Sequence, residues 1–242
     1  MTGYKDGSFF TSGFVTMYMC KETIRRAVVQ KFKEQTHFDS DNFGDLVKFT
    51  TGTYKKEELK KCNEIINSLK ICDPAVGSGH FLVSALNEIL AIKAKLGILT
   101  DDIGKRLQDF EMDVENDELM ILDGSGEFFK YEPKNWKTHE IQKTLFHEKQ
   151  TIIENCLFGV DINQNSVNIC RLRLWIELLK NAYYKENGEL ETLPNIDINI
   201  KCGNSLISRY PLDADLKEVL RESRFSIDAY RIAVNSYRNA EN

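Results

Sequence analysis

The sequence predicts an α/β fold in which a parallel sheet binds a nucleotide or nucleoside at the carboxyl ends of its strands. An apolar run followed by Gly77, Gly79 and a helical pattern predicts a strand that turns sharply into a helix. A second apolar run ends in Asp161 and again precedes a helical pattern. Residues 196–202 alternate strictly between polar and apolar, as a third strand would. In open α/β sheets, ligands bind where such strands end.

The turn after the first strand has the sequence Asp-Pro-Ala-Val-Gly-Ser-Gly-His-Phe over residues 73–81. A dinucleotide fingerprint would need a third glycine at Leu82, and a P-loop would need Lys-Ser/Thr where His80 and Phe81 stand. Asp73 would repel a pyrophosphate but could receive the ammonium group of an amino acid. The expected ligand is therefore zwitterionic rather than a polyphosphate.

The second strand, residues 156–162, ends in an acidic residue, Asp161, and a helix is expected over 163–180. A carboxylate beside the glycine turn suits two vicinal hydroxyls, because it can accept a hydrogen bond from each. The alternative is that Asp161 only caps the helix that follows it.

The separation between the two strands is long, so we expect an insertion over about 98–155. Within it, residues 119–131 predict a β-hairpin that turns at Asp123-Gly124, and residues 137–155 predict an amphipathic helix. We interpret the glycines at 124 and 126 as part of this turn rather than as a second ligand loop.

Two further segments complete the pattern. The third strand ends in Gly-Asn-Ser-Leu at 203–206, and Gly-Ser-Phe-Phe-Thr-Ser at 7–12 precedes a helical stretch over 15–32. The first could be a plain turn, and Phe9 and Phe10 could be core aromatics.

The string at 73–81 resembles motif I of the amino-group DNA methyltransferases, most closely the adenine-N6 methyltransferases fused to nucleases in type IIG restriction–modification enzymes. Asp161 resembles their motif II, residues 203–206 their motif III, and residues 7–12 their motif X. The resemblance implies a Rossmann-like S-adenosylmethionine-dependent methyltransferase sheet. The sheet would be incomplete, with N-terminal helices and an inserted hairpin/helix region.

The implied cofactor is S-adenosyl-L-methionine. Asp73 and the two glycines, with Thr11, would hold its methionine part. Asp161 would bind the ribose, and Ile162, Asn204 and Ser205 would frame the adenine. The cofactor-binding set implied by the resemblance is Phe10, Thr11, Asp73, Pro74, Ala75, Gly77, Gly79, Phe81, Asp161, Ile162, Asn204 and Ser205. The chain departs from the family pattern at Ser12, where proline is usual, and at Asn204, where many relatives carry Asp.

Amino methyltransferases act through an Asn/Asp-Pro-Pro-Tyr/Phe motif, and this sequence contains no Pro-Pro pair. We therefore expect no catalytic residue here and a chain truncated before that motif. The expected domains are an N-terminal helical segment (1–68), a cofactor-binding α/β domain (69–210) and the helical start of a further segment (211–242). The complete enzyme would act on an extruded adenine of double-stranded DNA, with possible fused nuclease and target-recognition domains. The alternatives are a non-catalytic nucleoside-binding or interaction module, and a methyltransferase acting on RNA or protein.

The composition fits a cofactor domain better than a DNA clamp. The 242 residues carry a net charge of −5, whereas proteins that grip duplex DNA show concentrated basic surfaces. The six cysteines lack CxxC spacing, so no metal site is expected, and Cys72, Cys156 and Cys202 are expected to be buried in strands. No apolar run is long enough to span a membrane, and we expect a cytoplasmic protein.

Overall fold

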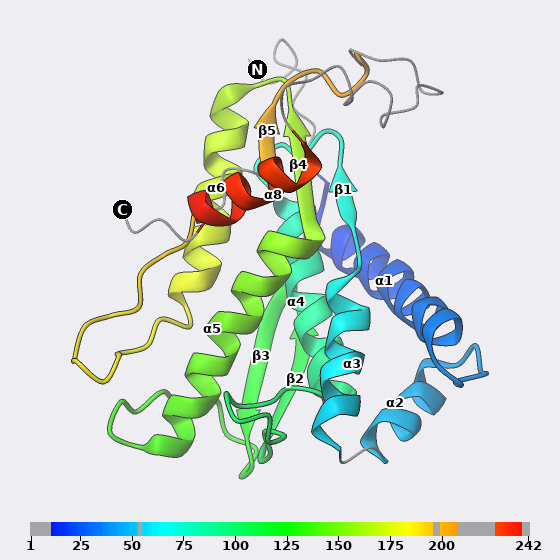
Figure 1. The fold of residues 1–242 in the computed structure, drawn as a ribbon, viewed down its shortest axis with the longest axis vertical. Helices are drawn as coiled ribbons and strands as arrows, with labels where there is room; N and C mark the ends of the chain where they lie inside the picture. The colour runs from blue at the N-terminus through cyan, green and yellow to red at the C-terminus, as the bar shows by residue number, and fades with distance from the viewer. Residues whose placement is uncertain (1–10, 53–54, 196–198, 208–225, 239–242) are drawn as a thin grey trace.

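A computed structural model describes residues 11–52, 55–195, 199–207 and 226–238 of the chain (Figure 1). The elements are, in order, α1 (Gly13–Gln35), α2 (Phe43–Thr51), α3 (Lys56–Asn67), β1 (Ile71–Asp73), α4 (His80–Lys95), β2 (Phe110–Glu115), β3 (Glu118–Asp123), α5 (Trp136–Cys156), β4 (Leu157–Asp161), α6 (Gln164–Leu179), β5 (Ile200–Cys202) and α8 (Ile227–Arg238). The predicted helices at 15–32, 81–96, 137–155 and 163–180 are confirmed as α1, α4, α5 and α6.

The expected parallel sheet is confirmed, with β4 between β1 and β5. Asp73 lies opposite Gly159 and Asp161 opposite Cys202, so the three strands end at the same edge. β4 follows α5 directly, and its start is held by Asn199, whose side-chain amide donates to the Leu157 carbonyl at 3.0 Å. The sheet occupies the upper half of Figure 1.

The prediction that the three strand cysteines are buried is wrong for two of them. Cys156 is buried, but Cys72 and Cys202 are exposed. Within the part of the chain that the structure describes, β1 and β5 are the outer strands of the sheet, so their side chains have neighbours on fewer sides.

α4 is the central helix of the core. Every residue from Leu82 to Lys93 is buried, because α1, α3, α5, the sheet and the hairpin all pack around this helix. Its N-cap is Gly79, with φ at 80°, a left-handed conformation that glycine adopts without a steric penalty. A Cβ atom there would lie 2.5 Å from Sγ of Cys170 on α6, so the sharp turn and the tight helix packing both require glycine.

The hairpin of the inserted region differs from the prediction. β2 and β3 pair in antiparallel register and turn at Asn116-Asp117. The predicted turn at Asp123-Gly124 exists, with the Gly126 N–H donating to the Asp123 carbonyl at 2.9 Å, but its second arm is a single bridge from Leu122 to Phe128. The two ordered strands therefore lie on either side of a turn that contains no glycine.

Some predictions fall on residues outside the described ranges. Phe10, residues 196–198 of the third predicted strand and residues 211–225 of the predicted helical tail are among them, whereas α8 confirms a helix in the last part of that tail. None of the described helices is long and apolar enough to cross a membrane.

Candidate functional site

The predicted loop and the predicted acid meet at the carboxyl edge of the sheet. The loop after β1 crosses over the end of β4, where the Val76 N–H donates to the Val160 carbonyl at 2.9 Å. One residue later, the Gly77 N–H donates to Oδ2 of Asp161 at 2.8 Å. These two bonds hold the glycine turn directly over the acid, although the two segments are far apart in the sequence.

Gly77 leaves open space beside the loop. Its φ is +53°, and a Cβ atom built on it would find nothing closer than the Ala75 carbonyl oxygen of its own loop, at 4.0 Å. Gly159, in contrast, is closely packed, since a Cβ atom there would lie 2.8 Å from Cγ2 of Val76. Gly159 thus allows the loop to pack against β4, and Gly77 leaves space for a ligand on the exposed side of the loop.

The Asp161 carboxylate organises two turns at once. Oδ2 accepts from Gly77, and Oδ1 accepts from the Asn163 N–H at 2.8 Å, just before α6 begins. The second bond supports the alternative in which Asp161 holds the start of the following helix, although the N-cap itself is Asn163. Each carboxylate oxygen has a second lone pair, so the half-exposed group can still accept from a ligand.

Three more predicted residues follow the ends of β4 and β5 and are open to solvent. Ile162 is 72% exposed, which is unusual for a large apolar side chain beside a buried strand. Asn204 and Ser205 are also exposed. The carbonyl Oδ1 of Asn204 accepts from the Leu206 N–H at 2.9 Å, so in this structure Asn204 shapes a turn, as the simpler interpretation predicted.

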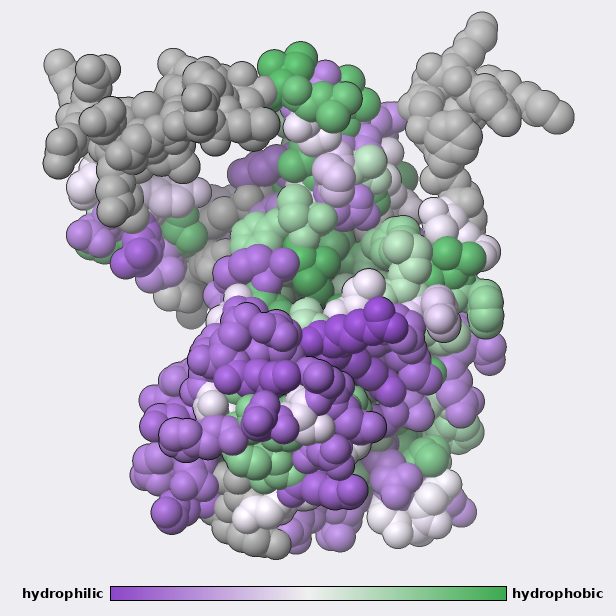
Figure 2. Space-filling model, turned by 90° about the vertical axis from the view of Figure 1, so that its right-hand side faces the viewer, coloured by the Kyte–Doolittle hydropathy of each residue, from purple (hydrophilic) through white to green (hydrophobic). Residues whose placement is uncertain are grey.

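Three of the remaining predicted residues lie beside β1. Asp73, Pro74 and Phe81 line a mostly apolar hollow of about 250 Å³ between α1, β1 and α4. Hydrophobic side chains are exposed in the upper part of the face shown in Figure 2, whereas the lower part is strongly hydrophilic. Asp73 also accepts from the Ala75 N–H at 3.0 Å, and Thr11 lies exposed just before α1. The structure thus joins Gly77 to Asp161 directly, whereas Phe81 lines the separate hollow beside α1.

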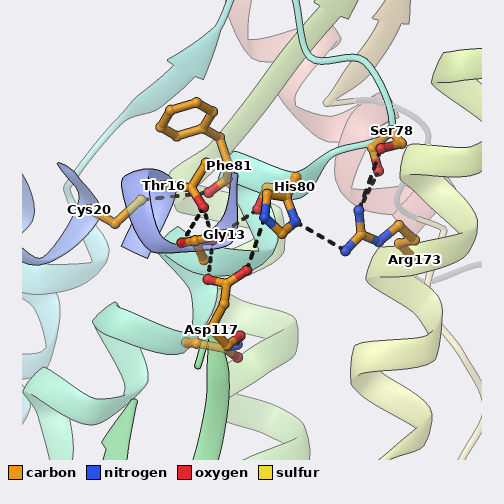
Figure 3. Close-up of polar contacts among 10 residues, drawn as sticks. Gly13, Thr16, Cys20, Ser78, His80, Phe81, Asp117 and Arg173 are labelled. Atoms are coloured by element: carbon orange, nitrogen blue, oxygen red, sulfur yellow. Dashed lines mark hydrogen bonds and ion pairs between the residues drawn. The ribbon is translucent and has the colours of Figure 1, made fainter. Parts of the chain in front are cut away.

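Sequence reasoning missed a polar cluster beside the glycine turn (Figure 3). His80 lies between Asp117, with 3.2 Å from Nε2 to Oδ2, and Arg173, with 3.4 Å from Nδ1 to Nη2. Arg173 also reaches the Ser78 carbonyl at 3.4 Å, and the Ser84 hydroxyl donates to Asp117.

A signal for Asp117 was available, because Asn and Asp are among the residues that suit turns with positive φ, and residues 110–115 before the turn alternate between apolar and polar. We find no comparable signal for Arg173, which comes from the middle of α6.

Burial makes the cysteines of this region packing residues. Cys170 lies against Gly79, and burial raises the pKa of its thiol to about 12, so it stays protonated. Cys20 on α1 has its pKa raised to about 12 for the same reason, and its sulfur lies 3.8 Å from the Phe81 carbonyl oxygen. Neither thiol is suited to nucleophilic chemistry at neutral pH.

The glycine turn and the strand-end acid lie at the carboxyl edge of a parallel sheet, which is where open α/β sheets bind their ligands. The family described as "MmeI, DNA-methyltransferase domain" matches residues 49–221. The chain belongs to this family of DNA-methyltransferase domains, which confirms the resemblance found in the sequence.

Two curated relatives are similar to the chain. RM.MjaORFECS2P of Methanocaldococcus jannaschii, provisionally named a type II restriction enzyme and methyltransferase, is 33% identical over 222 residues, which cover 88% of this chain and 15% of the relative. The type II restriction enzyme and methyltransferase RM.Eco57I of Escherichia coli is 29% identical over 170 residues, covering 69% and 13%. The chain therefore spans only a small part of the length of these relatives. No solved structure is significantly similar to it.

Proposed function

We propose that this chain is the S-adenosyl-L-methionine-binding part of a site-specific adenine-N6 DNA methyltransferase of a restriction–modification system. The observation that carries the proposal is the 2.8 Å hydrogen bond from Gly77 to Asp161, because it brings a ligand-accessible glycine turn and a ribose-type acceptor to one edge of the sheet. The free space beside Gly77 supports the fit of a ligand at this edge.

Each end of the cofactor has candidate partners. Asp73 would attract the ammonium of the methionine part, and Thr11 would donate to its carboxylate. The open lone pairs of Asp161 would accept from the ribose hydroxyls. Ile162 would cover one face of the adenine. Its side chain is 72% exposed, so it is accessible to a ligand, and binding would bury its apolar surface. Asn204 and Ser205 would approach the adenine edge after local rearrangement of their turn. The same proposal includes Phe10, Pro74, Ala75 and Phe81 as lining residues.

When bound, S-adenosylmethionine supplies the activated methyl group. The role of this chain's own residues is to bind and orient the cofactor. We propose three parts: an N-terminal helical segment (1–68), the cofactor-binding domain (69–210) and a helical segment leading onward (211–242). In the longer enzyme that we propose, other parts of the polypeptide would bind double-stranded DNA, receive the extruded adenine and carry any nuclease activity.

Calorimetric titration of the purified chain with S-adenosylmethionine tests cofactor binding, with ATP and NAD as controls. We expect S-adenosylmethionine to bind and neither control to do so. Binding of ATP or NAD in preference, or no binding by a folded chain, would contradict the proposal.

The type of base requires the longer enzyme. Incubating it with DNA and radiolabelled S-adenosylmethionine, then digesting the DNA to nucleosides, should place the label in N6-methyladenine. Label in a methylated cytosine, in RNA or in protein would refute adenine-N6 DNA methylation.

A further inference from the structure

The turn between β2 and β3 lies against α4 beside the glycine turn. Glu115 pairs with Glu118 across the hairpin, so Asn116 and Asp117 form a two-residue turn with φ values of 50° and 66°. Two-residue turns with both central φ values positive match the twist of the strands, and Asn and Asp tolerate this conformation better than most residues. The hairpin register therefore fixes the position of the Asp117 side chain.

Asp117 contacts three residues on one face of α4. Its Oδ2 lies 3.2 Å from Nε2 of His80, its Oδ1 accepts from the Ser84 hydroxyl, and its backbone carbonyl accepts from Nδ2 of Asn87 at 3.1 Å. Helical positions separated by three or four residues share a face, so these contacts align the hairpin with the first two turns of α4. The Asp117 side chain is only 11% exposed, so water competes weakly for these contacts.

His80 connects this contact to the glycine turn. A guanidinium group can only donate, so in the 3.4 Å contact between Nη2 of Arg173 and Nδ1 of His80 the imidazole nitrogen is the acceptor. The other guanidinium nitrogen, Nη1, donates to the Ser78 carbonyl at 3.4 Å and lies 3.5 Å from its hydroxyl. Ser78 stands between the two glycines of the turn.

The start of α1 joins the same cluster. Gly13 leaves little room here for a side chain, because a Cβ atom on it would lie 3.4 Å from Nε2 of His80 and 3.6 Å from Cβ of Asp117. Thr16 donates to the Gly13 carbonyl at 2.9 Å and lies 3.3 Å from the Ser84 hydroxyl oxygen. The hairpin tip, the beginning of α1 and the glycine turn are therefore fixed relative to one another by one set of contacts (Figure 3).

We propose that Asp117 is a positioning residue for the cofactor site. Through His80 and Arg173 it holds the backbone around Ser78, and through Ser84 and Thr16 it holds the start of α1, in the arrangement that receives the methionine end of S-adenosylmethionine. This inference rests on the proposed cofactor function. If Asp117 acts in this way, the affinity for the cofactor depends on a hairpin tip that does not itself contact the cofactor.

The test compares Asp117→Ala, Asp117→Asn and the unaltered chain in two measurements. The first is the S-adenosylmethionine dissociation constant by calorimetry. The second, made without ligand, is amide hydrogen exchange of Gly77 and Gly79, whose N–H groups donate to Asp161 and to the Val76 carbonyl. We expect Asp117→Ala to weaken binding and to speed exchange at both glycines, each by about tenfold, the effect of losing about 1.4 kcal/mol. Asp117→Asn should restore most of the affinity and most of the protection from exchange, since an amide of the same shape can keep the contact with His80 and hydrogen-bond to Ser84.

Glu115→Gln is the matched control, because it removes one negative charge from the same hairpin tip at an exposed residue. It should change neither measurement. Should Asp117→Ala fail to fold, Arg173→Met tests the same connection from α6, with the same expected losses. Unchanged exchange and affinity in a folded Asp117→Ala or Arg173→Met variant would overturn the positioning role. Failure of the unaltered chain to bind would refute the cofactor proposal, whereas the exchange measurement, which needs no ligand, would still show whether Asp117 holds the glycine turn.

Discussion

The Gly77 N–H and the Asp161 carboxylate, 84 residues apart in the sequence, form a 2.8 Å hydrogen bond at the carboxyl edge of the sheet. Asp161→Ala should therefore weaken S-adenosylmethionine binding by about ten- to a hundredfold, since hydrogen bonds to a charged acceptor contribute about 1.5–3 kcal/mol. Calorimetry measures the loss. Asp161→Asn keeps an acceptor for the Gly77 N–H, so its free energy of unfolding should stay close to that of the unaltered chain. Its affinity for S-adenosylmethionine should still fall, because the charge is lost. Unchanged affinity in a folded alanine variant would contradict the ribose assignment.

Gly79 and Gly77 offer a matched pair of substitutions. Both have positive φ, so alanine at either position should cost about 1–2 kcal/mol of backbone strain. Gly79→Ala should cost about 1–3 kcal/mol more in the free energy of unfolding, because its Cβ would lie 2.5 Å from Sγ of Cys170, whereas Gly77 faces open space. Urea denaturation measures both values, and adding Cys170→Ala should recover part of the loss only in the Gly79 variant. Equal costs at the two positions would argue against the packing explanation.

Ile162 and Ile103 are almost equally exposed, at 72% and 70%, but only Ile162 adjoins the candidate site. Neither substitution to alanine should change the melting temperature noticeably, because exposed side chains contribute little to stability. Ile162→Ala should weaken S-adenosylmethionine binding roughly fivefold, since about 1 kcal/mol of apolar contact is lost. Equal affinities of the two variants in the calorimeter would remove Ile162 from the adenine contact.

The parts of the fold that depend on local pattern were predictable. The glycine turn, the acid at the end of β4 and the helices α1, α4, α5 and α6 follow from periodicity and turn residues close to one another in the sequence. Strand order was not encoded locally, which is why the exposure of Cys72 and Cys202 was missed.

The hairpin turn was misplaced for a related reason. Asp123-Gly124 carries the stronger turn signal, but Asn116-Asp117 forms the tight turn, where contacts from His80, Ser84 and Asn87 on α4 stabilise it. Those contacts join residues at least 30 positions apart, so no local pattern could have revealed them or the part played by Arg173.

Glu88 links α4 to α1 through a buried ion pair with Arg25, with 2.7 Å between Oε1 and Nε. Burial raises the pKa of Glu88 above its ordinary value of 4.5, while Arg25, Lys95 and Lys21 oppose the shift. The folded state therefore keeps this proton at a higher pH than the unfolded chain does. The contribution of Glu88 to stability consequently falls as the pH rises from 4.5 through the raised pKa.

Glu88→Gln removes this dependence, because glutamine resembles the protonated acid at every pH. Relative to the unaltered chain, the variant should therefore gain stability as the pH rises from about 4 to 8. Urea denaturation of both proteins across this range measures the difference. A difference that stays constant, or that favours the unaltered chain increasingly at high pH, would contradict the account of the buried pair.

The central claim is that S-adenosylmethionine binds at the carboxyl edge of the β1–β4–β5 sheet. Two-dimensional ¹⁵N–¹H NMR during titration with the cofactor tests it most directly, because each amide reports on its own position. The account predicts that Gly77, Gly79, Ile162 and Asn204 shift progressively and saturate together, while amides along α2 stay unchanged. Saturable shifts confined to other parts of the molecule, or none at all, would contradict it.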